Sequence, residues 1–447
     1  MTHVLKKIFL VILYVVFFST LGYSQDRKQA PSEPMLLTLN QVWERLQVHS
    51  TSIQIKTILQ KSSAENIKDA MAGRLPDLNA EGEYARVSNM PVYENGIFHA
   101  SKQFPVLHAY YKIGSNAYFN LYNGNKTNLE IAKRKAELKI SGEQKEETIS
   151  EMKLNSAAFY LDILRSNIFK HFLLKDIEAQ QMQLKRIKTF QKNGVVLKSD
   201  VLRAELKLSK QTLALTQIEN DLKIANQKLN TLIGLADEQK VSPVETADID
   251  SIPLSEYEEY LDYAMFNAYQ IKISDQQKEL ARLNLKTTKA NVSPKVGLFA
   301  SYAYSYPQIF LYPYSANLYG FGMAGIKASF SISSIYKNLH KTKIARLNYE
   351  LMDVEIDQVR DDIRDHVNEA YLRFKEAVTR VSVTQVNVSQ AVENQRIVSN
   401  TYFNHLSLIT DLLDADTQLL QTHFDLAAAK IAARFQYYQL LNITGKL

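Results

Sequence analysis

Two aspartates in the C-terminal part of the chain have a spacing that permits chemistry. Asp411 and Asp414 are three positions apart in a leucine-rich segment, so on a helix both side chains project from nearly one face. A carboxylate at a helix start can bond the first free backbone amides, which accounts for Asp411 at most, because Asp414 lies too deep. The pair therefore predicts either a site that attracts cations or solvated helix surface.

These aspartates belong to a turn that occurs twice. Residues 193–202 (NGVVLKSDVL) and 404–413 (NHLSLITDLL) match at a constant separation of 211 positions. Gly194 is typical of the residue that ends a helix in the left-handed conformation. His405 stands at the equivalent position of the second turn.

Polar residues that suit the start of a helix follow in both turns. Ser199 and Asp200 in the first turn correspond to Thr410 and Asp411 in the second. We expect Ser199 or Asp200 to be the N-cap of the next helix, since both side-chain types cap helices well. Each turn predicts a helical hairpin, and an ordinary hairpin would show the same capping residues.

Very long helices must lead into these turns. The segment Asn128 to Lys192 contains no proline and a single glycine, Gly142, so its 65 residues would form a rod on the order of 100 Å long. Apolar residues spaced by three and four along Leu215–Leu232 and Ala377–Tyr402 are typical of coiled coils. Such rods must pack lengthwise against other helices.

One structural unit is predicted to occur twice, as residues 25–235 and 254–447, joined by a proline-containing acidic linker at 236–253. Each copy contains a short helix, two strands, a very long helix, a turn and another helix. The opening helices are predicted at Leu39–Met71 and Leu254–Ala290, and a proline-led strand follows each.

Four segments alternate apolar and polar residues with the period of a strand. They are Leu78–Tyr84, Tyr111–Leu121, Val296–Tyr306 and the glycine-rich Tyr319–Ile332, where the alternation slips. A barrel wall with a lipid face and a wet lumen needs this pattern, although a soluble half-buried sheet gives it too. The tyrosine-rich loop Pro307–Tyr319 favours the aromatic girdle of a membrane barrel.

The start of the chain predicts export. Residues 1–24 contain two lysines, an apolar run (Ile8–Phe18) and small residues at Gly22 and Ser24, as a cleaved signal peptide does. The chain has no cysteine, so disulfides cannot stabilise it. No later run is as long and apolar as a transmembrane helix requires, so any membrane portion is expected to be a β-barrel.

Charge and motifs exclude several classes of protein. Lysine and arginine total 53 against 47 acidic residues, and the two signs are interspersed along the chain. This gives no cluster of positive charge of the kind that binds nucleic acid. No catalytic triad spacing, zinc-protease motif or phosphate-binding loop occurs. We therefore expect no enzyme activity, no cofactor and no metal site.

Residues 402–416 (YFNHLSLITDLLDAD), their partner 194–205 (GVVLKSDVLRAE) and the duplicated proline-led strands resemble the TolC family of outer-membrane factors. The resemblance spans essentially the whole mature chain. It implies a fold that is mainly α with a β-barrel portion. In this fold a homotrimer closes a twelve-stranded barrel in the outer membrane and an α-helical tunnel in the periplasm.

The same resemblance implies a function and partners. The protein would be a passive exit duct of a tripartite efflux or type I secretion system in a Gram-negative cell. Its partners would be a periplasmic adaptor, an inner-membrane pump of the RND or ABC type, and outer-membrane lipid. The alternative is an exported periplasmic coiled-coil adaptor or scaffold, but such a protein would carry one hairpin, and this chain has two.

Roles at the tunnel tip also follow from the resemblance. The family's acidic pair that rings the pore matches Asp411 and Asp414. A family tyrosine that bonds the first repeat to hold the tip shut matches Tyr402, and its acceptor matches Asp200.

Two positions depart from the family pattern. Ser407 stands where the family has an arginine, so the ion pair of that lock cannot form and the lock is expected to be weaker or built differently. His405 replaces a glycine, which is expected to affect docking of the adaptor.

Overall fold

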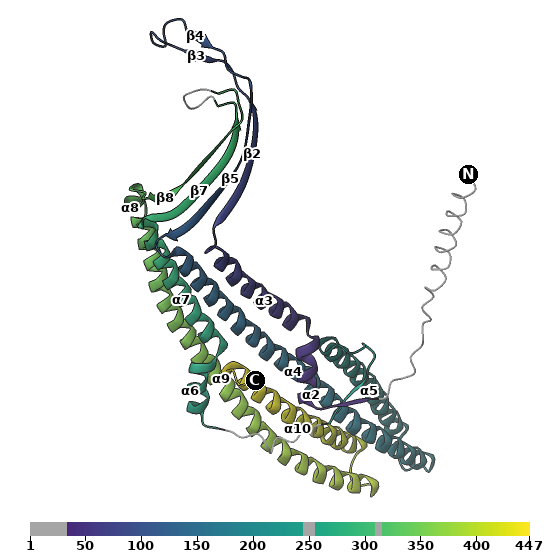
Figure 1. Cartoon of the computed structure of the whole chain (residues 1–447). Helices are drawn as coiled ribbons and strands as arrows, with labels where there is room; N and C mark the ends of the chain where they lie inside the picture. Colours follow the sequence, from purple (N-terminus) through teal and green to yellow (C-terminus); the bar gives the residue numbers. More distant parts are fainter. Residues whose placement is uncertain (1–33, 245–254, 309–314) are drawn as a thin grey trace, which may run out of the picture.

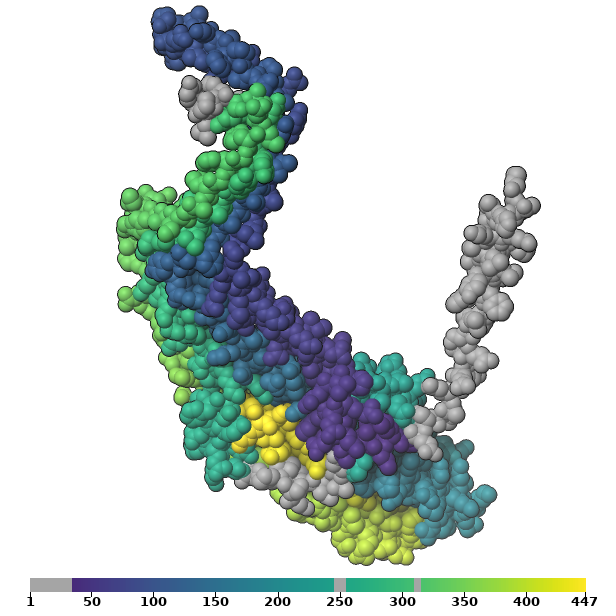
Figure 2. All heavy atoms as spheres, in the orientation of Figure 1, coloured from purple at the N-terminus to yellow at the C-terminus, as the bar shows by residue number. Residues whose placement is uncertain are grey.

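The computed structural model describes residues 34–244, 255–308 and 315–447. The predicted signal peptide, residues 245–253 of the predicted linker and residues 309–314 of the tyrosine-rich loop lie outside the described residues. The molecule is long and narrow, with a curved sheet at one end and the turns of two helical hairpins at the other (Figures 1 and 2).

The long helices form two hairpins. The first consists of α4 (Lys126–Lys192) and α5 (Lys198–Ile233), and the second of α9 (Leu339–Phe403) and α10 (Ile409–Thr444). Helix α4 has 67 residues, which confirms the predicted rod. It packs against α5, α10 and the shorter helices α3 and α7. No helix in the described ranges has an apolar stretch that could cross a membrane.

The shorter helices are α2 (Leu39–His49), α3 (Thr51–Ala72), α6 (Tyr257–Asn267), α7 (Tyr269–Lys289), the 3₁₀ turn η1 (Ala290–Val292) and α8 (Ser333–Lys337). All of them except α8, which follows β8 (Tyr319–Ser329), precede the long strands of their half. The single opening helix predicted in each half is therefore wrong. Ser50 and Ala268 each adopt an extended conformation, with ψ of 119° and 130°, and divide the helix in two.

The sheet has the order β2-β5-β7-β8, and each neighbouring pair is antiparallel. Its strands are β2 (Asp77–Arg86), β5 (Ala109–Tyr122), β7 (Lys295–Tyr306) and β8 (Tyr319–Ser329), which confirms the four predicted strands. Strands β5 and β7, from different halves of the chain, pair at the centre of the sheet.

The pairing register collects the predicted apolar positions on one face. Leu78 lies opposite Ala117, which lies opposite Ala300. Ile113 lies opposite Tyr304 in the same way. Directly opposed residues of an antiparallel pair point to the same side. The alternation along each strand therefore becomes one continuous apolar face, with carboxylates such as that of Glu81 on the other face.

The four remaining strands form two separate two-stranded sheets. Strand β1 (Met35–Leu37) pairs in parallel with β6 (Val241–Pro243), so part of the predicted linker forms a strand. The hairpin of β3 (Met90–Val92) and β4 (Lys102–Phe104) extends beyond the main sheet (Figure 1).

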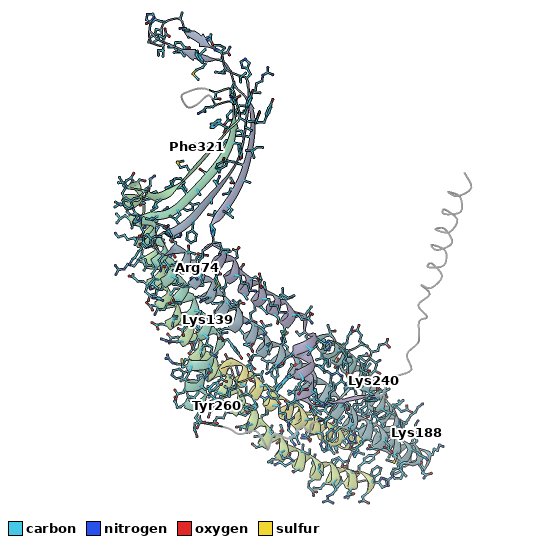
Figure 3. All side chains as sticks on the ribbon, viewed as in Figure 1. Arg74, Lys139, Lys188, Lys240, Tyr260 and Phe321 are labelled. Carbon is cyan, nitrogen blue, oxygen red and sulfur yellow. The ribbon has the colours of Figure 1, made fainter. Side chains whose placement is uncertain are left out.

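Two similar cores lie where the short helices meet the long ones. The first includes Val42, Leu46, Ile163, Leu229 and Ile233. The second is built around Tyr260, Val367, Phe374 and Leu440. Figure 3 marks Tyr260 in this region, with Phe321 on the sheet and Lys188 near the turn of the first hairpin. Each core joins the two long helices of one hairpin to the short helices of the same half.

Candidate functional site

An apolar cluster joins all four long helices beside the two turns. Its buried members are Ile187 of α4, Ala204 of α5, Tyr402 of α9, and Ile409 and Leu412 of α10. Because burial of these side chains is the main favourable term in packing the hairpins together, the cluster places the turn at 193–197 beside the turn at 404–408. We call this end of the molecule the tip.

The two turns have the same backbone geometry. Gly194 has φ of 75° and His405 has φ of 62°, so both are left-handed. The residue after each closes the helix end: Val195 N–H donates to Phe190 O at 2.9 Å, and Leu406 N–H donates to Thr401 O at 2.8 Å. This pattern is the Schellman motif. It confirms Gly194 as the residue that ends its helix, with His405 in the same role.

The predicted N-caps are wrong. Leu197 and Leu408 are the N-caps, with ψ of 158° in each, and the following helix begins one residue later. Ser199, Asp200 and Thr410 therefore lie inside the first helical turn. Neither leucine has a side-chain oxygen, so the cap residue itself offers no side-chain acceptor to the first free amides of its helix.

The acidic pair is exposed on α10. Asp411 Oδ2 accepts a hydrogen bond from Leu408 N–H at 3.0 Å, so this residue caps the helix from its third position. Asp414 makes no such contact with the turn. Burial lowers the pKa of Lys207, and the charge of Asp414 is one of those that oppose this shift. The structure thus separates the two acids, because capping explains Asp411 and leaves Asp414 unexplained.

The bond expected between Tyr402 and Asp200 is not formed in this structure. Tyr402 is 5% exposed, and its Oη has no hydrogen-bond partner among the described residues. Burial, and then the charge of Asp200, raise the pKa of Tyr402, so the two groups are close without bonding. The tyrosine ring instead packs in the apolar cluster. Ser407 Oγ accepts from Thr401 Oγ1 at 3.2 Å within its own hairpin.

Comparison with known proteins identifies the family. Residues 43–235 and 262–446 match the sequence model described as "Outer membrane efflux protein". The chain belongs to this family. It is 22% identical over 338 residues to the outer membrane efflux protein BepC of Brucella suis biovar 1 (strain 1330), with 73% of this chain and 70% of BepC covered.

Solved structures share the fold of this outer membrane efflux protein. CusC has a TM-score of 0.77 at 15% identity, with 94% of this chain and 95% of CusC covered. The outer-membrane channel OprN gives 0.75 at 13% identity, with 92% and 90% covered. VceC of Vibrio cholerae gives 0.73 at 17% identity, with 91% and 96% covered.

Family membership confirms the expected fold and the expected location. The protein is an outer-membrane channel of mainly helical fold with a barrel portion, and its helical part lies in the periplasm. Channels of this family are not enzymes. The match decides against the periplasmic adaptor as the alternative.

Aromatic contacts at the tip of the efflux protein were missed from the sequence. The Arg186 guanidinium lies over the Phe403 ring at 4.4 Å from its centre. The Phe190 ring lies 6.2 Å from that of Phe403 and 5.6 Å from that of His405. These contacts join α4 to the second turn. The repeat between the two turns could not predict these contacts, because at a separation of 211 positions Phe190 corresponds to Thr401 and no aromatic residue is repeated there.

A buried carboxylate deeper in the helices was also missed. Asp416 Oδ2 accepts from Gln180 Nε2 and Asp416 Oδ1 accepts from Gln395 Nε2, both at 2.9 Å. Lys207 Nζ lies 3.6 Å from Asp416 Oδ2 and donates to Leu413 O at 2.8 Å. The signal in the sequence is that Asp416 lies four residues after Leu412 and three before Leu419, on the apolar face of α10. The acidic pair just before it obscured this signal.

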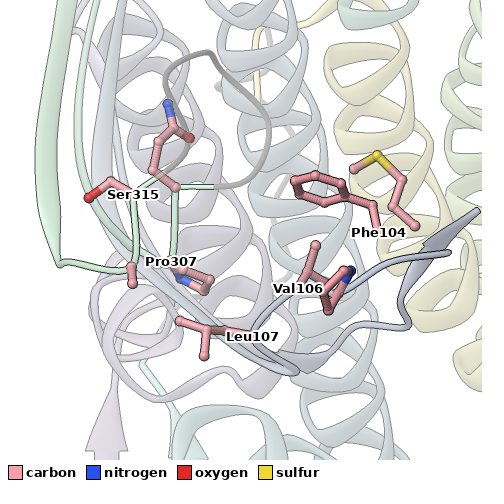
Figure 4. A pocket seen from close by; sticks show the side chains of 9 residues that line it. Phe104, Val106, Leu107, Pro307 and Ser315 are labelled. Carbon is pink, nitrogen blue, oxygen red and sulfur yellow. The ribbon is translucent and has the colours of Figure 1, made fainter. Parts of the chain in front are cut away.

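A pocket at the opposite end of the molecule lies between the outer loops. It is lined mainly by apolar side chains, among them Phe104, Val106, Leu107 and Pro307 (Figure 4). It is remote from the tip and contains no ionisable side chain among its lining residues.

Proposed function

We propose that three copies of this chain form a passive exit duct of a tripartite efflux or type I secretion system. One observation carries the proposal: the main sheet ends in two long strands, β2 and β8, that have no partner on their outer side among the described residues. An unpaired edge is a template for another strand. Pairing of β2 of one copy with β8 of the next would satisfy every edge in a closed ring.

The apolar face of the sheet supports a position in lipid. Leu78, Tyr84, Ile113 and Ile326 on this face are between 67% and 77% exposed in the single chain. Side chains of this kind in contact with water would be unfavourable by about 25 cal/mol for each Å² of apolar surface. Lipid would cover them in a membrane.

Exposed apolar side chains along the helices support assembly with further copies. They include Ile55 and Ile58 of α3, Leu206 and Leu213 of α5, and Leu347 and Val354 of α9. Contiguous apolar surface on long helices marks a protein interface. Helices of neighbouring copies would cover these side chains and complete the wall of a tunnel.

We infer the partners and the tip residues from the same assembly. Asp411 and Asp414 would line the narrow end of the tunnel, and the turns around Gly194 and His405 would meet a periplasmic adaptor. An inner-membrane pump of the RND or ABC type would supply the energy. BepC is an outer membrane efflux protein by name, which supports efflux as the activity.

Fractionation and channel recording test this proposal. We expect the protein in the outer-membrane fraction as a trimer that dissociates on heating, and we expect the purified trimer to conduct ions across a planar bilayer. A monomer in the soluble periplasmic fraction would contradict the proposal, and so would a trimer that conducts no ions.

A further inference from the structure

One buried carboxylate contacts every helix of the two hairpins. Asp416 belongs to α10, and its hydrogen-bonding and ionic partners are Gln180 of α4, Lys207 of α5 and Gln395 of α9. The side chains of Lys207 and Asp416 are only 12% and 7% exposed. In addition, Lys207 holds the carbonyl of Leu413 on α10. Three of these contacts cross from the first hairpin to the second.

The cost of burial indicates that this cluster has a role other than stability. Removing a carboxylate and an ammonium from water is unfavourable, and their attraction recovers this free energy only when the remaining hydrogen-bonding groups are satisfied. An apolar pair of similar volume would often stabilise the packing as well or better. The apolar cluster at the tip already joins the same four helices, so a buried ion pair is not needed merely to hold them.

An ion pair differs from apolar packing in how it responds to separation. Dispersion contacts weaken steeply within about 1 Å of separation. The attraction of an ion pair falls off more slowly with distance, but it drops when water enters between the charges and raises the local dielectric constant. The cluster lies seven residues into α10, or about 10 Å from the start of that helix. Movement of the second hairpin away from the first would therefore expose it early.

We propose that Asp416 and Lys207, with Gln180 and Gln395, form a buried latch that holds the second hairpin against the first and so restricts the opening of the helical end. This inference rests on the proposed function as a duct. The latch is distinct from the residues Tyr402, Asp200 and Ser407, for which the described part of the chain shows no hydrogen bond between the hairpins.

A distance measurement between the hairpins tests the latch. The chain has no cysteine, so Lys185→Cys on α4 and Gln418→Cys on α10, both at exposed positions, can carry a pair of spin labels without background. Labelled chains are diluted with unlabelled ones so that a trimer holds a single pair. We expect Asp416→Asn to give a longer and broader distance distribution and a larger single-channel conductance than the parent.

A matched control is available on the same helix. Asp425 is exposed, and its carboxylate accepts from Gln421 Nε2 at 2.8 Å within α10 alone. Asp425→Asn removes the same charge without touching the other helices, so the distance distribution should equal that of the parent. A shift in this variant as large as that of Asp416→Asn would contradict the latch.

Each remaining outcome also decides the question. An Asp416→Asn trimer with the distances of the parent overturns the latch. If Asp416→Asn does not assemble, the double variant Lys207→Met with Asp416→Leu removes both charges of the ion pair. The latch stands if this double variant assembles with longer distances, and it is overturned if the distances are those of the parent or if assembly fails again. If the parent conducts no ions but Asp416→Asn still lengthens the distances between the hairpins, the duct is contradicted and the latch between the hairpins is retained.

Discussion

At the residue scale, the left-handed conformation of His405 has a cost that Gly194 avoids. A side chain with a Cβ in this conformation is strained by roughly 1–2 kcal/mol, whereas glycine is not. The histidine ring lies 5.6 Å from Phe190, but that contact is at the exposed surface of the tip. The second turn therefore carries strain that the first does not.

We expect His405→Gly to stabilise the protein by about 1 kcal/mol per chain, because it removes this strain. Gly194→His is the reciprocal change and should destabilise by a similar amount. Thermal unfolding of the two variants beside the parent measures both effects. Equal melting temperatures in all three would show that the left-handed conformation is not costly at these turns.

Asp176 of α4 belongs to the environment of the buried cluster. Its carboxylate accepts a hydrogen bond from Gln211 Nε2, and burial raises its pKa to about 6 although Lys207 opposes the shift. Asp416 adds to the increase. An aspartate in an unfolded chain titrates near pH 4. The folded protein therefore holds the proton more tightly than the unfolded chain does.

Stability linked to Asp176 is present at low pH and is lost as the pH rises from about 4 to about 6. Asp176→Asn keeps an oxygen that can accept from Gln211 and removes the titration. We expect this variant to gain more stability relative to the parent at about pH 7.5 than at about pH 4.5. Comparing the two proteins by thermal unfolding at both pH values cancels the other titrating groups. The same difference at both values would contradict the assignment.

At the element scale, regular patterns were predictable and single interruptions were not. The absence of proline across α4 predicted its length, and alternation predicted all four long strands. The break at Ser50 was not predictable, because a serine with extended backbone has no signal that distinguishes it from a helical serine. The predicted N-caps are wrong for a related reason: Leu197 and Leu408 are poor capping residues by type and their side chains are exposed, so neither capping chemistry nor burial marks them in the sequence.

The sheet also shows which glycines are required. A Cβ on Gly114 of β5 would lie 2.7 Å from Ala303 Cβ and 3.0 Å from the backbone oxygen of Tyr302. A Cβ on Gly82 of β2 would meet no atom within 4 Å. The central pair of strands therefore approaches closely at Gly114, and the edge strand has room at Gly82.

We expect Gly114→Ala to lower the temperature at which the trimer dissociates, because the neighbouring backbone must move to admit the methyl group. Overpacking of this kind costs about 1–3 kcal/mol. Gly82→Ala is the matched change in the same sheet and should have little effect. Heating series followed by gel electrophoresis compare the two, and a larger loss in Gly82→Ala than in Gly114→Ala would contradict the strand packing described here.

At the scale of the whole molecule, a single chain is only part of a wall. The sheet is open at both edges, and apolar side chains of α3, α5 and α9 are exposed. The structure of one chain accordingly cannot contain the pore. In the proposed trimer, symmetry would gather the Asp411 and Asp414 carboxylates of every copy around one axis.

Such a ring would act on permeating ions through its field. Low-dielectric walls focus the field of like charges in a narrow opening, so a ring of carboxylates favours cations over anions and binds multivalent cations. The capping bond from Leu408 N–H to Asp411 makes asparagine the better replacement there, since its oxygen can still accept this bond. Asp411→Asn with Asp414→Asn thus removes charge while the helix start is retained.

We expect this double variant to fold and assemble as the parent does, to lose cation selectivity, and to lose block by a trivalent cation added on the periplasmic side. Reversal potentials in a salt gradient across a planar bilayer measure the selectivity. Asp425→Asn, an exposed acid farther along the same helix, controls for the general loss of negative charge. Matching reversal potentials in the parent and the double variant would mean that Asp414 is solvated helix surface and that Asp411 serves only as a cap.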